Sequence, residues 1–249
     1  MTAPAFKERT LPLLWEIALG GSEYEDFINI AAELAASTTS YQDVSDDGDI
    51  TLMTAEAAIF CSSSDNGDTG DIFLTYMDDD YIVRTVQQTL AGFTETQMGS
   101  VTNVFRCLKV ESFDFEPVGD VYVYETGGTV TNGVPQDADD KKLKMQIGFN
   151  RSLSSVQAIP ASKTGLLPLG FRLGAGSSSG MSARLVEITG VQDIPQTILA
   201  PSGLARADSG FVVPIAFPEK TDFKLQAKHD QGSAVQMSGT VPIVLVPKE

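Results

Sequence analysis

Short runs that alternate between apolar and polar side chains, separated by turn-forming residues, occupy most of this chain. Between residues 48 and 140 these runs cover 50–53, 58–61, 72–76, 81–86, 104–110 and 120–124. In the fifth run the alternation predicts two faces of one strand. One face carries Val104, Arg106, Leu108 and Val110, and the other carries Phe105, Cys107 and Lys109. Short strands at about ten-residue spacing, joined by hairpin-type turns, predict an antiparallel β-sandwich.

The same pattern continues from residue 141 to residue 249, with runs at 143–147, 155–159, 165–173, 183–188, 210–215, 222–227 and 241–246. In the sixth run Phe223, Leu225 and Ala227 alternate with polar neighbours, which predicts one buried and one solvent-facing side. We therefore expect an all-β fold of two antiparallel sandwiches, of jelly-roll or immunoglobulin-like type.

Residues 1–47 differ from the rest, because their apolar residues follow helical spacing. Phe27 is followed by apolar residues three, four and seven positions later, at Ile30, Ala31 and Leu34, which predicts a helix over residues 23–36. A capping serine, Ser22, precedes this stretch. We expect a short, partly helical N-terminal arm.

The arm is too apolar to be a free tail. Its large side chains fall in two clusters on either side of the Gly20-Gly21 pair: Leu13, Leu14, Trp15 and Ile17, then Phe27 and Ile30. Soluble proteins seldom expose such a patch, so it covers either the first sandwich of its own chain or a neighbouring subunit. We favour a neighbouring subunit, with Trp15 as the anchor, because large aromatic residues dominate interface energies.

Charge divides the chain in two. The net charge is −16, but residues 1–140 hold 26 acids and 5 bases, whereas residues 141–249 hold 7 acids and 12 bases. The shift predicts a boundary near residue 140, which gives an arm (1–47), an acidic sandwich (48–140) and a mildly basic sandwich (141–249). Such an acidic chain is a poor partner for nucleic acid.

Two further features narrow the functional classes. No apolar run is long enough to cross a bilayer, and the first residues lack the hydrophobic region of a signal peptide, so no membrane partner is expected. Cys61 and Cys107 are the two cysteines; they are too few for a disulfide framework, and we expect both to be reduced and buried.

Candidate catalytic residues lack the context that catalysis needs. Ser178 lies in a G-x-S-x-G match and His229 is the one histidine, but a nucleophile elbow requires a strand before it and a helix after it. A strand-like run follows instead, which indicates a hairpin loop. We predict no enzymatic activity, no catalytic or zinc-binding residues and no cofactor, since phosphate-binding glycine motifs are absent as well.

Acidic turns at residues 65–71 and 78–80 are candidate ligands for a hard cation. The first departs from the calcium-loop order, with glycine at the third position and no glutamate at the twelfth. The alternative is a pair of solvated hairpin turns, where Asp, Asn and Gly are favoured for local reasons. The sequence leaves Ca²⁺ binding open.

Within residues 59–76 a small, acidic loop precedes a strand, and the Asp78-Asp-Asp80 turn, the strand that ends at Leu90-Ala-Gly92 and the strand 101–110 follow. This order of elements resembles that of the virion structural proteins of tailed bacteriophages. Residues 155–167 are similar to the family element x-Y-x-V-P-A-G-K-T-A-Y-L, and the strands 223–227 and 241–246 fit its close. This chain departs from the element with Ser162 in place of glycine and Leu166-Leu167 in place of an aromatic residue.

The resemblance implies a non-enzymatic, multi-copy virion protein that decorates the capsid or belongs to the collar or tail. Its expected partners are copies of itself and other virion proteins, such as major capsid or head–tail proteins. The alternative is a β-sandwich that binds carbohydrate or a receptor, which a cluster of exposed aromatic residues beside the Asp-rich loops would favour.

Overall fold

The computed structural model describes residues 26–36, 40–45, 50–125, 128–152, 154, 156–167, 172–175, 181–188, 193–194, 206–208, 215–229 and 235–248. Within these ranges every regular element is a β-strand, which confirms the all-β prediction. None of the described segments forms a helix that is long and apolar enough to span a membrane.

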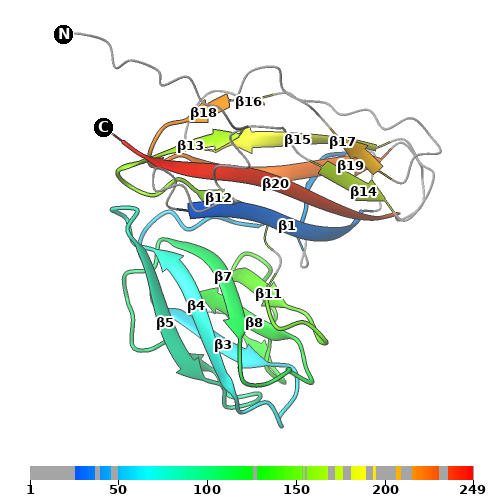
Figure 1. The fold of residues 1–249 in the computed structure, drawn as a ribbon. Coiled ribbons are helices and arrows are strands. Elements are labelled where there is room, and N and C mark those ends of the chain that lie inside the picture. Colours follow the sequence, from blue (N-terminus) through cyan, green and yellow to red (C-terminus); the bar gives the residue numbers. More distant parts are fainter. Residues whose placement is uncertain are drawn as a thin grey trace.

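Two sheets enclose the core of the lower lobe in Figure 1. One sheet has the order β11-β8-β3-β6 and contains β3 (Ile59–Ser63), β6 (Thr96–Gln97), β8 (Val121–Glu125) and β11 (Lys141–Met145). The other has the order β5-β4-β7 and contains β4 (Asp71–Met77), β5 (Val83–Thr89) and β7 (Arg106–Ser112). A small hairpin pairs β9 (Val130–Thr131) with β10 (Val134–Pro135). Ile59, Leu74 and Val123 are fully buried between the two sheets. We call residues 50–152 the inserted lobe.

The upper lobe, which we call the base, also contains two sheets. The first has the order β17-β14-β20-β13-β18, with β1 added along β20; its strands are β1 (Asp26–Ala36), β13 (Lys163–Leu167), β14 (Arg172–Ala175), β17 (Arg206–Asp208), β18 (Ile215–Phe217) and β20 (Val235–Pro247). The second has the order β12-β19-β15-β16, with β2 added along β19; its strands are β2 (Gln42–Asp43), β12 (Val156–Ala158), β15 (Met181–Glu187), β16 (Asp193–Ile194) and β19 (Asp222–His229). Phe217 and Phe223 stack between the two sheets with ring centroids 5.5 Å apart.

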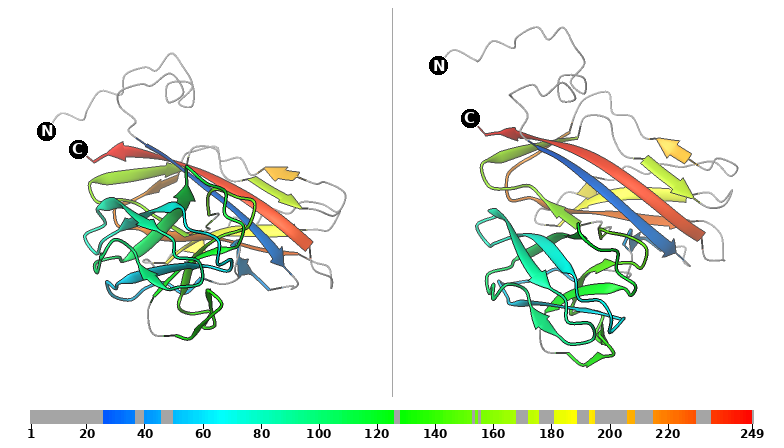
Figure 2. Two further views of the ribbon diagram at one scale, coloured as in Figure 1. Left: turned by 90° about the horizontal axis from the view of Figure 1, so that it is seen from below. Right: turned by 60° about the horizontal axis from the view of Figure 1, so that its bottom comes forward.

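The inserted lobe interrupts the base. The chain contributes β1 and β2 to the base, builds the whole inserted lobe, and returns to the base at β12. Figure 1 shows the consequence, since β1 (blue) lies beside β20 (red) although some 200 residues separate them. The right-hand view of Figure 2 also shows the inserted lobe projecting from the base.

The predicted helix over residues 23–36 is wrong for residues 26–36, which form β1. All eleven residues pair antiparallel with β20, from Asp26 opposite Leu245 to Ala36 opposite Val235. The helical spacing misled because Ile28 and Ala32 are apolar too, so the segment is apolar at odd and even positions alike. Such a segment fits either structure, and long-range pairing overrides local spacing.

The predicted boundary near residue 140 does not match the division between the sheets. β11 pairs with β8, so the first strand after the predicted boundary belongs to the inserted lobe. Ser152 still donates its N–H to the carbonyl of Val110. The change of charge at residue 140 thus falls inside one lobe, which holds 7 Lys and Arg against 16 Asp and Glu, a net charge of −9.

Both cysteines are free and buried, as predicted. Burial raises the pKa of the Cys61 and Cys107 thiols to about 12, so neither forms the reactive thiolate near neutral pH.

We therefore expect both thiols of the native chain to react very slowly with a disulfide reagent at pH 8. The control is the same protein in guanidinium chloride, where both should react quickly. Rapid reaction of the native chain would contradict the burial.

Candidate functional site

Exposed large apolar side chains gather on two neighbouring loops of the inserted lobe. Four of the exposed large hydrophobic residues lie there: Phe113 and Val118 after β7, and Ile147 and Phe149 after β11. Phe113 is 68% exposed although it is one of the largest side chains in the protein. Soluble proteins expose contiguous apolar patches mainly where they bind something.

The two loops enclose an open groove with a volume of about 460 Å³. Residues 112–116 form one wall and residues 148–150 the other. The backbone N–H of Ser112 donates to the carbonyl of Asn150 at 2.8 Å, which fastens the walls together. Phe113 also packs against Phe73 of β4, with ring centroids 5.1 Å apart, and this contact orients the ring.

The groove lies at the end of β7 that is farther from the base. Arg106, the first residue of β7, contacts the base, whereas Ser112, the last, borders the groove. The chain then runs back beside β7, since Ser152 pairs with Val110 and β12 lies against β7. The site is therefore held at the free end of the projecting lobe.

Asp68 fixes the loop beside the groove. Its carboxylate is buried and accepts hydrogen bonds from the backbone N–H groups of Val118 (2.9 Å) and Gly119 (3.0 Å) and from the hydroxyl of Ser63 (2.5 Å). A carboxylate that accepts several such bonds organises a loop strongly. Asp68 is thus a structural residue that shapes one side of the groove.

The acidic turn 65–71 does not form a cation site in the structure. Asp68 points inward, the Asp65 carboxylate caps the N–H of Gly67, and the Asp71 carboxylate accepts hydrogen bonds from Thr89 and Gln87. Across the residues that the structure describes, acidic, histidine and cysteine side chains make no group of three that could hold a metal ion. The turn does lie beside the groove, because the ring of Phe115 packs directly over Gly70.

The second acidic turn, 78–80, presents Tyr81 to the base. Asp78 is buried and accepts hydrogen bonds from the N–H of Ile82 (2.9 Å) and from Nε of Arg84 (2.8 Å). Burial acts to raise the pKa of Asp78, but these hydrogen bonds outweigh it and lower the pKa below its usual value. The turn holds Tyr81 at a φ of 63°, a conformation that few residues other than glycine adopt.

A buried ion pair joins the two lobes. Nη2 of Arg106 lies 2.7 Å from Oδ2 of Asp222, which is completely buried at the start of β19. The hydroxyl of Tyr81 donates to the same oxygen at 2.9 Å. Burial, together with the negative charge of Asp222, raises the pKa of Tyr81 to about 12, so the phenol keeps its proton and donates. The Arg106 guanidinium also lies over the ring of Phe105, 3.7 Å from its centroid.

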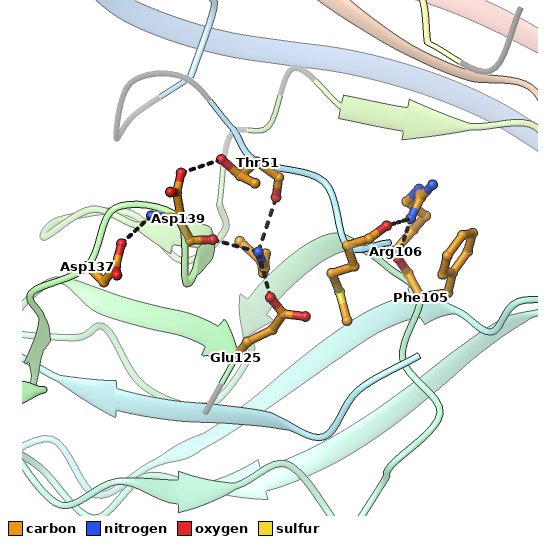
Figure 3. Close-up of polar contacts among 8 residues, drawn as sticks. Thr51, Phe105, Arg106, Glu125, Asp137 and Asp139 are labelled. Carbon is orange, nitrogen blue, oxygen red and sulfur yellow. Dashed lines mark hydrogen bonds and ion pairs between the residues drawn. The ribbon is translucent and has the colours of Figure 1, made fainter. Parts of the chain in front are cut away.

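Further polar contacts surround Arg106 on the side of the inserted lobe, as Figure 3 shows. Arg106 donates to the carbonyls of Met53 and Phe105. Thr51 donates to Asp139, and Lys142 binds the carbonyls of Thr51 and Asp139 and the carboxylate of Glu125. These bonds tie the segment that enters the inserted lobe to the region of β11. The cavity that remains there measures only about 10 Å³, too small to hold more than one water molecule.

Most of the predicted interface residues lie outside the described residues: Leu13, Leu14, Trp15 and Ile17. Phe27 and Ile30 lie on β1, whose backbone pairs with β20 of the same chain. Ser178 also lies outside the described residues, and His229 ends β19 opposite Met181. The interface therefore stays a prediction.

Sequence reasoning did not single out the residues of the groove or of the junction. Arg106 had a signal, because it is the one charged residue on the apolar side of its run, and an arginine in that position needs a buried partner. For Phe113 and Phe149 the sequence offers no such signal. An aromatic residue looks the same in sequence whether it fills a core or lines a groove.

Comparisons with known proteins identify no family for this chain. No family model matches it, and no curated protein matches it. One solved structure, described as "Structure of infectious bursal disease virus Gx strain", aligns with 91% of this chain and 80% of its own chain at 9% identity, with a TM-score of 0.12. A TM-score this low supports no conclusion about fold or function.

Proposed function

We propose that this chain is a non-enzymatic, multi-copy structural protein of a tailed-phage virion, either a capsid decoration protein or a component of the collar or tail. The partners we assign to it are copies of itself and the major capsid or head–tail proteins. The resemblance in the order of strands and turns suggests this class. The geometry adds a reason of its own.

The observation that supports the proposal best is the buried junction between the lobes. The pair of Arg106 and Asp222, with Tyr81, fixes a projecting acidic sandwich to a base built from both ends of the described chain. A removable or flexible module would not need a fully buried ion pair, because such a pair is costly to bury and loses its value if the lobes separate. A rigid base with a rigid projection suits a protein that is displayed on a particle.

Purified particles test the proposal directly. We expect this chain to co-sediment with the major capsid protein through a density gradient of particles from the source organism, and immunogold labelling to mark the particle surface. Mass spectrometry of the gradient fractions provides the copy number relative to the capsid protein. If the chain stays with the free proteins at the top of the gradient, while the capsid protein sediments, the proposal is wrong.

A second candidate function is binding of carbohydrate or of a receptor. The aromatic groove favours it, since Phe113, Phe115 and Phe149 are grouped beside the acidic turn 65–71. The two functions are compatible, because a displayed protein can bind a ligand at its free end.

A further inference from the structure

We propose that the groove between residues 112–116 and 148–150 binds a neutral oligosaccharide, with the rings of Phe113 and Phe149 as platforms for pyranose rings. This inference names the ligand class of the second candidate function, and it does not depend on virion membership.

The lining of the groove is the first reason. A pyranose ring presents an apolar C–H face and a rim of hydroxyl groups, so its binding site needs exposed aromatic faces beside hydrogen-bonding groups. Phe113 and Phe149 are 68% and 45% exposed. Asp114, Glu116 and Asn150 line the same groove with carboxylate and amide groups. The volume of about 460 Å³ falls within the usual range of small-molecule sites, about 300–1,000 Å³.

The acidic groups of the groove are exposed and can accept hydrogen bonds from a ligand. An ionised carboxylate only accepts them. Among the hydrogen bonds and ion pairs of the described residues, none involves the carboxylate of Asp114 or of Glu116. Sugar hydroxyls are donors that these two carboxylates can use, and they carry no charge whose desolvation would oppose binding.

Charge disfavours anionic ligands. The inserted lobe has a net charge of −9, and its two groove carboxylates add local repulsion toward sulfated, phosphorylated or sialylated glycans. A second copy of the chain is also disfavoured, because an isologous contact through this groove would bring two −9 lobes together. A neutral glycan meets neither obstacle.

The test uses the full chain and isothermal titration with maltohexaose, cellohexaose and chitohexaose, after a screen on a glycan array that also holds sialylated and sulfated glycans. We expect binding of at least one neutral glycan and none of the anionic ones. Phe113→Ala and Phe149→Ala should each weaken binding by roughly tenfold or more, since each removes one stacking platform. Ile82→Ala is the matched control, because Ile82 is exposed on the same lobe but at the junction end of β4.

Three results would overturn the inference. The first is that no neutral glycan on the array binds. The second is that both phenylalanine variants bind as tightly as the unchanged chain. The third is evidence that the groove binds protein. Such evidence would be a changed sedimenting mass in the phenylalanine variants, or binding of an oligolysine peptide by a chain that binds no glycan. None of these results bears on whether the chain sediments with particles, so the inference and the proposed virion role fail independently.

Discussion

Replacing Asp222 with alanine should lower the free energy of unfolding by about 3–5 kcal/mol. The change leaves the Arg106 guanidinium buried without its carboxylate and removes the acceptor of the Tyr81 hydroxyl. An uncompensated buried charge is far more costly than the loss of one contact. Chemical unfolding in urea, followed by circular dichroism, measures the loss.

Two further variants make this test specific. Glu219→Gln breaks the exposed ion pair of Glu219 with Lys248 and should leave the stability nearly unchanged. The double variant Arg106→Met with Asp222→Leu removes both charges and should recover much of the loss, because apolar residues can replace a buried pair. An Asp222→Ala variant as stable as the unchanged chain would mean that the junction is open to water.

Replacing Asp68 with alanine should cost about 2–4 kcal/mol of unfolding free energy. The buried N–H groups of Val118 and Gly119 and the Ser63 hydroxyl would lose a charged acceptor together. Thermal and urea unfolding measure the change. Asp80→Ala is the control, since Asp80 is acidic but exposed, and it should have little effect.

The unchanged chain and the Asp68→Ala variant also test whether the acidic turn 65–71 binds a cation. With Asp68 committed to the loop, millimolar Ca²⁺ should not raise the melting temperature of the unchanged chain. A clear rise that the Asp68→Ala variant lacks would show instead that the turn binds the cation.

Local patterns predicted the strands of this protein better than they predicted its lobes. The alternation of Phe223, Leu225 and Ala227 with Lys224, Gln226 and Lys228 places the first three in the core and the others at partly exposed positions, as expected. Alternation over a few residues reports directly on which side of a strand is buried. It carries no information on which distant strand is the partner.

The sequence misleads about which strands pair with each other. β1 belongs to the base because all eleven of its residues pair with β20. The sequence near residues 26–36 does not indicate which strand this partner is. The charge shift at residue 140 is real, but charge on solvated surfaces is not tied to the boundaries of a sheet. β11 therefore sits in the acidic lobe despite its three lysines.

The residues of the candidate site also depend on distant partners that local sequence patterns do not reveal. The sequence left the acidic turns as either cation ligands or solvated hairpin turns, but Asp68 and Asp78 are buried. Asp68 binds backbone N–H groups beside the groove, and Asp78 binds Arg84 and the turn that carries Tyr81. The N–H groups of Val118 and Gly119, which bind the Asp68 carboxylate, lie 50 and 51 residues farther along the chain, and no local sequence pattern indicates such a contact.

The pairing of β1 with β20 also sets an order of events during synthesis. The inserted lobe is built from one continuous stretch, residues 50–152, so all of its strands are available once the ribosome has released that stretch. The sheet that contains β1 is incomplete until β20 emerges, nearly 200 residues after β1. Contacts that are close in sequence form sooner than contacts that must close a long loop. The nascent chain should thus carry a folded inserted lobe while the edge of β1 is still unpaired. During this interval β1 is most exposed to pairing with strands of other chains.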